Sequence, residues 1–156
     1  MLLKAGQPAP DFTLLDEDEK SQTLSGYRGS PVVLYFYPRD DTPGCTTEAC
    51  NFRDDYSDYQ NVNAVILGVS ADTPESHAKF KKKFNLPFTL LSDTEKEVCQ
   101  MYSVWGLKKN FGKEYEGIIR TTYLIDAEGV IAKVFENVTP AEHSEEVLAA
   151  IKTIAG

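Results

Sequence analysis

The sequence predicts an α/β fold in which a central mixed β-sheet is flanked by helices. Short apolar runs at residues 32–37 and 64–70 alternate along the chain with segments of helical periodicity. Two further runs, residues 119–125 and 130–135, flank a turn at residues 126–129 that is typical of a hairpin. Strands that alternate with helices indicate parallel pairing and a hairpin indicates antiparallel pairing, so the sheet should contain both.

The first half of the chain supplies two strands and two helices. Residues 32–37 are rich in β-branched and aromatic side chains, which favour a strand, and residues 64–70 form a second one. A helix is expected from residue 43 to about residue 60, because four side chains recur there as an inward stripe: Ala49, Phe52, Tyr56 and Tyr59. Thr73 and Pro74 suit an N-cap and a first helical position, so another helix should run to Phe84.

The second half begins with a short strand at residues 87–91. Residues 92–95 have the spacing of a capping box, which starts a helix through Tyr102. A terminal helix opens at Thr139 and Pro140 and should turn four apolar side chains inward: Val147, Leu148, Ile151 and Ile154. This order of elements matches a thioredoxin-like fold, and a length of 156 residues favours a single domain over residues 1–156.

Composition and charge exclude several classes of function. The formal net charge of −8 disfavours binding to nucleic acid or to anionic lipid. A basic cluster, Lys79 with residues 81–83, is interpreted as a solvated helix face. No apolar run approaches the ~20 residues of a membrane span, and the N-terminus lacks the apolar stretch of a secretory signal. We therefore expect a cytoplasmic protein without a nucleic-acid or membrane partner.

Cys45 is the first candidate for chemistry. The chain has three cysteines and no C-x2-C pair, which disfavours a zinc ribbon and a thioredoxin-type redox motif. Cys45 falls in the first turn of the helix expected at residue 43, with Thr42 as N-cap and Pro43 at the first helical position. Unpaired backbone N–H groups and the helix dipole favour a thiolate there, so Cys45 is a candidate nucleophile. The alternative is a small residue that fills the helix–sheet junction.

The spacing of Cys50 constrains any pairing with Cys45. Residues five apart in a helix have Cα atoms roughly 8–9 Å apart, whereas a disulfide needs less than about 7 Å. The two cysteines can therefore bond only if this helix unwinds; otherwise Cys50 is a core residue beside the apolar stripe. Cys99 is interpreted as a partly buried thiol without a role, a partner thiol for Cys45 being the alternative. His77 is expected on a helix face and His143 on the surface.

These residues resemble the peroxiredoxin family, whose active-site pattern is P-x-x-x-[TS]-x-x-C. Pro38, Thr42 and Cys45 match it. Residues 120–126 look like the family's arginine strand and supply Arg120, which alone would be interpreted as a solvent-facing strand residue; residues 6–14 look like its N-terminal strand. A cysteine five residues after Cys45, here Cys50, is similar to one subfamily, bacterioferritin comigratory protein or peroxiredoxin Q.

The resemblance implies a thioredoxin fold and a peroxidase that converts ROOH and two thiols into ROH, water and a disulfide. It makes Cys45 the peroxidatic and Cys50 the resolving cysteine. The groups implied to hold the peroxide or shield the sulfur are Thr42, Gly44, Arg120 and Pro38. It further implies thioredoxin or a similar dithiol as reductant, no metal or other cofactor, and a monomer. The alternatives are a thiol–disulfide oxidoreductase acting on protein disulfides, which the missing C-x-x-C disfavours, and a non-enzymatic binding module.

Overall fold

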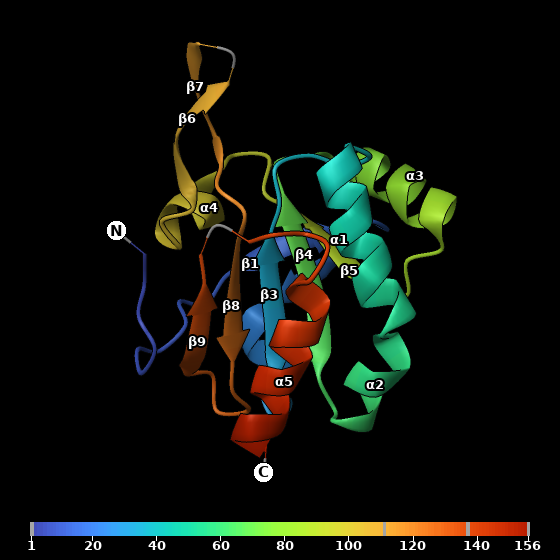
Figure 1. Cartoon of the computed structure of the whole chain (residues 1–156), viewed down its shortest axis with the longest axis vertical. Helices are drawn as coiled ribbons and strands as arrows, with labels where there is room; N and C mark the ends of the chain where they lie inside the picture. The colour runs from blue at the N-terminus through green and yellow to red at the C-terminus, as the bar shows by residue number, and fades with distance from the viewer. Residues whose placement is uncertain (1, 111, 137, 156) are drawn as a thin grey trace.

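A seven-stranded mixed sheet forms the centre of the structure, a computed structural model that describes residues 2–110, 112–136 and 138–155 (Figure 1). The strand order is β2-β1-β5-β4-β3-β8-β9, and a separate two-stranded ribbon consists of β6 and β7. The strands are β1 (Thr13–Asp16), β2 (Ser21–Thr23), β3 (Val32–Phe36), β4 (Val65–Ser70), β5 (Thr89–Ser92), β6 (Trp105–Asn110), β7 (Lys113–Ile118), β8 (Thr121–Ile125) and β9 (Ile131–Phe135). The helices are η1 (Leu24–Tyr27), α1 (Pro43–Asp54), α2 (Tyr56–Asn61), α3 (Pro74–Phe84), α4 (Glu97–Met101) and α5 (His143–Ala155).

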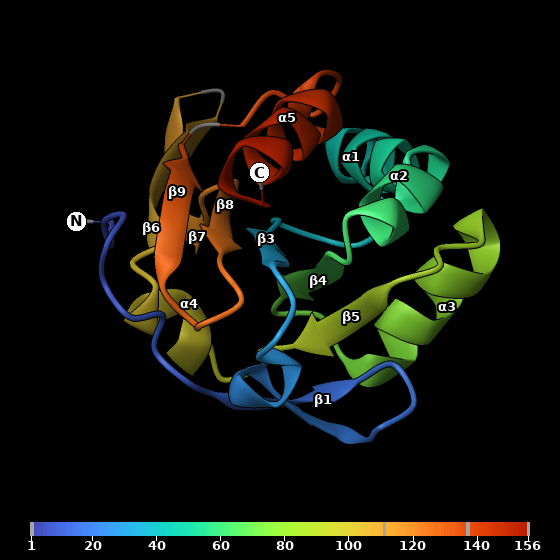
Figure 2. The same ribbon diagram turned by 90° about the horizontal axis from the view of Figure 1, so that it is seen from below.

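The two faces of the sheet are covered by different helices. Figure 2 shows α1, α2, α3 and α5 on one face and α4 on the other. The alternation along β3 explains this arrangement, because successive side chains of a strand point to opposite faces. Val33 and Tyr35 belong to the core beneath α1 and α5, whereas Val32, Leu34 and Phe36 belong to the core beneath α4. Both faces of β3 are thus buried, as its continuous apolar sequence requires.

Strand pairing confirms the expected mixed sheet. β3 and β4 are parallel, as are β4 and β5, whereas β3 with β8 and β8 with β9 are antiparallel. The carboxyl ends of β3 and β4 therefore lie at one edge of the sheet, where the loops into α1 and α3 begin. At this same edge Phe36 pairs with Thr121, which places the residue before β8 beside the residues that follow β3. This edge holds the candidate site.

The helix starts were predicted with mixed success. Thr73 caps α3 as expected, since its Oγ1 accepts a hydrogen bond from Ser76 N at 3.1 Å. The capping box expected at residues 92–95 is wrong: α4 begins at Glu97, and the Asp93 carboxylate accepts bonds from the backbone N–H groups of Val98 and Cys99. The Asp93 carboxylate, which lies before the helix, thus accepts from first-turn N–H groups of α4 that a capping residue would otherwise bind. Among the described residues, every helix is too short or too polar to span a lipid bilayer.

Three further elements differ from expectation. The helix expected over residues 43–60 is broken at Asp55 into α1 and α2, although Ala49, Phe52 and Tyr59 are buried as its stripe predicts. The terminal helix α5 begins at His143 rather than at Thr139, and Ile154, expected inside, is 41% exposed near the chain end. The β6–β7 ribbon, which projects beyond the sheet in Figure 1, was not predicted at all.

Candidate active site

Cys45 lies at the start of α1, where the sequence places it. Thr42 is the N-cap residue in an extended conformation, Pro43 is the first helical residue, and Thr46 N donates to Thr42 O at 2.8 Å. The first-turn N–H groups of a helix are unpaired and favour an anion close by. Cys45 is only 1% exposed, within the core formed by α1, α5 and the sheet. Cys45 thus lies in the first turn of α1, shielded from solvent.

Arg120 contacts the Cys45 sulfur directly. Its Nη2 donates to Cys45 Sγ at 3.2 Å. The residue lies in the short link between β7 and β8, not within the strand expected over residues 119–125, because the pairing of β8 with β3 begins only at Thr121. That register explains how a residue 75 positions away reaches the start of α1. Burial alone would lower the pKa of Arg120, but its interactions with Glu48 and Cys45 raise that pKa above its ordinary value.

Glu48 is the third member of this buried polar cluster, with Cys45 and Arg120, and was not recognised from the sequence. Arg120 Nη1 donates to Glu48 Oε1 at 2.6 Å, so one guanidinium bridges the carboxyl group and the sulfur. Glu48 follows Cys45 by three residues, a spacing that puts both side chains on one face of α1. Burial raises the pKa of Glu48 to about 7, against the opposing effect of Arg120. The three-residue spacing between Cys45 and Glu48 could have indicated a shared face of α1. It points to Glu48 as a site residue only when a cation such as Arg120 is known to lie against that face.

The other sequence-predicted residues lie on the loop before α1 and in its first turn. Thr42 Oγ1 donates to Arg39 O at 3.0 Å and makes no capping bond to α1, so its hydroxyl oxygen keeps lone pairs for another donor. A Cβ on Gly44 would lie 3.2 Å from Arg120 Nη2, so a side chain there would press on the guanidinium. Pro38 is half-buried on the loop that leads from β3 towards α1. Thr42, Gly44 and Pro38 are therefore brought to the same loop and helix start as Cys45.

Cys50 and Cys99 occupy very different surroundings. Cys50 is a half-buried free thiol on the same unbroken helix as Cys45. The next residue, Asn51, ties this part of α1 to the segment before α5, because its Nδ2 donates to Pro140 O and Ala141 O. Cys99 is fully buried, and burial, together with Asp93, raises the pKa of its thiol well above the ordinary value. Cys50 is thus the more accessible of these two thiols.

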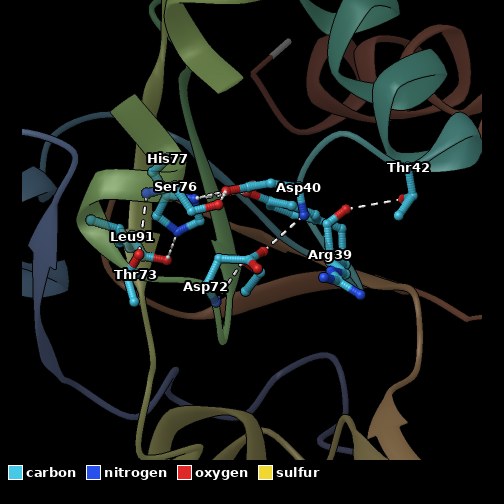
Figure 3. Close-up of polar contacts among 10 residues, drawn as sticks. Arg39, Asp40, Thr42, Asp72, Thr73, Ser76, His77 and Leu91 are labelled. Atoms are coloured by element: carbon cyan, nitrogen blue, oxygen red, sulfur yellow. Dashed lines mark hydrogen bonds and ion pairs between the residues drawn. The ribbon is translucent and has the colours of Figure 1, made fainter. Parts of the chain in front are cut away.

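Both histidines are buried: His143 was expected on the surface, which is wrong, whereas His77 lies on a face of α3 as expected, but on the buried one. His143 is 0% exposed and lies between Thr122 Oγ1 and Glu146 Oε1. His77, also 0% exposed, lies near Asp40 and Asp72 in an arrangement that resembles a metal-ligand set (Figure 3). Both ring nitrogens of His77 have protein partners: Nδ1 lies 2.8 Å from Asp40 Oδ2 and Nε2 lies 3.0 Å from Leu91 O, so hydrogen bonds account for the arrangement.

The fold and the site define a class of protein: a thioredoxin-like protein with one buried, guanidinium-bound cysteine at a helix N-terminus. Comparisons with known proteins agree. Residues 5–134 match the model of the AhpC/TSA family. The chain is 50% identical over 155 residues to peroxiredoxin Bcp of Bacillus subtilis, covering 99% of each chain, and 44% identical over 146 residues to peroxiredoxin Bcp of Escherichia coli, covering 94% of each.

Solved structures give the same result. The bacterioferritin comigratory protein of Xanthomonas campestris, studied for its alkyl peroxide reduction activity, superposes with a TM-score of 0.91 at 36% identity, covering 98% of this chain and 100% of that one. PrxQ of Xylella fastidiosa, as a cysteine-to-serine variant, gives a TM-score of 0.94 at 32% identity, covering 100% and 99%. The chain belongs to the AhpC/TSA family, in its peroxiredoxin Bcp/peroxiredoxin Q branch. It is a thiol-dependent peroxidase, an oxidoreductase, and the thioredoxin-like fold expected from the sequence is confirmed.

Proposed function

We propose that this peroxidase uses Cys45 as its peroxidatic cysteine, on hydrogen peroxide and organic hydroperoxides. The observation that carries the proposal is the 3.2 Å contact between Arg120 Nη2 and Cys45 Sγ. The thiolate is the nucleophilic form of cysteine, and a guanidinium in contact with the sulfur can hold that anion and the charge that develops on the peroxide. The thiolate attacks the terminal peroxide oxygen, so an S–O bond forms as the O–O bond breaks. Cysteine is oxidised to sulfenic acid, and the leaving RO⁻ takes a proton to become ROH.

The surrounding groups are proposed to stabilise that transition state. Arg120 stabilises negative charge as it moves from sulfur to the leaving oxygen, and its bond to Glu48 keeps the guanidinium in place. The Thr42 hydroxyl and the backbone N–H groups near Gly44 and Cys45 hydrogen-bond the peroxide. Pro38 shields the sulfur from water. With Cys45 1% exposed, the site favours slender substrates that reach the sulfur end-on.

Cys50 is the proposed resolving cysteine. Its thiolate attacks the sulfenic sulfur, a disulfide forms, and the sulfenic oxygen leaves as water after protonation. Because both cysteines lie in α1, the helix must unwind locally before the disulfide can form. A dithiol then reduces the disulfide; the thiol reductant follows from the family, and its assignment to thioredoxin or a similar protein is part of the proposal. A monomeric state, a cytoplasmic location, a single domain and the absence of nucleic-acid partners remain predictions from the sequence.

The test is peptide mapping after one equivalent of hydrogen peroxide. Two titratable thiols per chain should disappear, and the new disulfide should join Cys45 to Cys50 within one chain. Cys45→Ser should abolish peroxide consumption, Cys50→Ser should stop at a sulfenic acid, and Cys99→Ser, the matched buried control, should behave as the parent. A Cys45–Cys99 bond, or bonds between chains only, would show that Cys50 does not resolve Cys45. Rapid insulin reduction with slow peroxide turnover would instead favour the thiol–disulfide oxidoreductase.

A further inference from the structure

The loop between β3 and α1 is attached to α3 through the carboxylate of Asp40. Asp40 Oδ1 accepts a hydrogen bond from Tyr37 Oη at 2.5 Å, and Oδ2 accepts from Ser76 Oγ at 2.8 Å and faces His77 Nδ1 at 2.8 Å. Figure 3 shows the Ser76 and His77 side chains converging on Asp40 from α3. Three contacts on one nearly buried side chain hold it in a single position, since each lost contact would leave a buried polar group unpaired.

The second nitrogen of His77 makes this attachment stiffer. Nε2 lies 3.0 Å from Leu91 O, a carbonyl that can only accept, so Nε2 carries a proton. Nδ1 then faces the carboxyl group of Asp40, and one further proton must lie between these two atoms for a hydrogen bond to form. The side chains of His77 and Asp40 are 0% and 4% exposed. The imidazole is therefore held at both ends, between β5 and the loop.

The attachment extends along the loop to the active site. Asp40 N donates to Asp72 Oδ2 at 2.8 Å, and the Thr42 hydroxyl donates to the carbonyl of Arg39 at 3.0 Å. Asp41, between them, adopts a left-handed conformation with φ of 56°. Aspartate tolerates this conformation better than most other non-glycine residues, so Asp41 can connect the two bonded residues at little cost. The position of Thr42 thus depends on contacts that begin at His77.

We propose that Asp40 and His77 are positioning residues for the peroxide reaction. They fix residues 39–42 so that the Thr42 hydroxyl and the first turn of α1 meet the peroxide beside Cys45. The inference rests on the proposed roles of Thr42 and Cys45. Neither Asp40 nor His77 contacts Cys45 among the hydrogen bonds of the described residues, so their effect on the reaction passes through the loop.

Asp40→Asn separates the effect of the hydrogen bonds of the Asp40 side chain from the effect of its charge. Its Oδ1 can accept from Tyr37, and its Nδ2 can donate to Ser76 Oγ and to a neutral His77 protonated on Nε2. All three contacts survive without an ionised group. Asp40→Asn should therefore preserve the loop, whereas Asp40→Ala removes the contacts. His77→Gln is the second variant, because glutamine cannot reach both Asp40 and Leu91 as the imidazole does.

The experiment compares two reactions of one thiol. In a Cys50→Ser/Cys99→Ser background, second-order rate constants are measured for sulfenic acid formation with hydrogen peroxide and for alkylation by iodoacetamide. Alkylation needs the thiolate but no peroxide-binding groups. We expect Asp40→Ala and His77→Gln to slow the peroxide reaction about tenfold to a hundredfold, as displaced catalytic groups do. Alkylation should change less than about twofold, in keeping with an unaltered thiolate, and Asp40→Asn should retain most of the peroxide rate.

Asp16→Ala is the matched control for a purely structural effect. Asp16 is equally buried and also has three donors, Asp18 N, Lys20 N and Gln22 Nε2, but it lies at the β1–β2 turn. It should lower the melting temperature without changing the ratio of the two rates. A parallel fall in peroxide and alkylation rates would overturn the positioning role, as would an Asp40→Asn rate as low as that of Asp40→Ala. If Cys45→Ser still consumed peroxide, the proposed function itself would fail instead.

Discussion

Glu48→Gln tests the most unusual electrostatic feature of the site, a carboxyl group with a pKa near 7 inside the core. The side chain is 1% exposed and bonded to Arg120, and burial raises its pKa from 4.5 to about 7. Between these values the unfolded chain has an ionised glutamate while the folded protein keeps the proton. The folded state then binds more protons, so stability falls as pH rises. A shift of this size corresponds to about 3 kcal/mol, reached above pH 7.

The assay is urea unfolding of the parent and of Glu48→Gln at pH 5 and pH 8. Glutamine cannot ionise, so the stability of the parent relative to the variant should fall by about 2–3 kcal/mol over this interval. Taking the difference cancels the other titrating groups, and Glu145→Gln, an exposed site on α5, is the control. A difference that stays constant from pH 5 to pH 8 would refute the reasoning, because Glu48 would then have the same pKa in both states.

Three further outcomes follow from single contacts. Arg120→Met should lower kcat/KM for peroxide by about 10²–10³-fold. Arg120→Lys should be intermediate, because an ammonium group cannot bridge two acceptors as a guanidinium does. Equal rates for the lysine variant and the parent would contradict this. Asn51→Ala loses two hydrogen bonds to carbonyls before α5, so the free energy of unfolding should fall by about 1–2 kcal/mol and amide exchange in α1 should rise. Unchanged amide exchange would show that Asn51 does not control the unwinding of α1. Tyr35→Phe should be neutral or stabilising by up to about 1 kcal/mol, because the buried hydroxyl has no hydrogen-bond partner among the described residues. A clearly lower free energy of unfolding would reveal a partner such as a bound water.

The fold was predictable wherever an element buries one face or both. β3 and β4 have continuous apolar sequences, and α3 has its N-cap and proline at the expected positions. The β6–β7 ribbon carries no such signal. Its second strand is mostly exposed and rich in charge, so no apolar alternation distinguishes it from a loop. Strands that pair mainly with each other, away from the core, leave little trace in a hydrophobic pattern.

The site was predictable only where its residues are close in sequence. Cys45 and Thr42 follow from the rules for helix starts, and the resemblance to the family supplied Arg120. Its actual contact depends on the pairing of β8 with β3, which sequence spacing does not reveal. The burial of His77 was not predicted, for a related reason. This residue lies near the start of a lysine-rich helix that looks solvated, and its partner Asp40 lies on a loop 37 residues away, so the local sequence gives no sign of its burial.

The two ends of the catalytic segment have opposite requirements. In the proposed mechanism, reaction with peroxide needs Thr42 and Cys45 held still, whereas disulfide formation needs the helix between Cys45 and Cys50 to unwind. The contacts are distributed accordingly: buried, multiply bonded Asp40 fixes the loop before α1, and half-buried Asn51 holds the helix through two exchangeable side-chain bonds. Buried networks resist opening more than exposed ones do. If Cys45 and Cys50 act as proposed, we expect oxidation to unwind α1 while the loop before it keeps its position, so that the first turn of α1 can reform on a loop that is already in place.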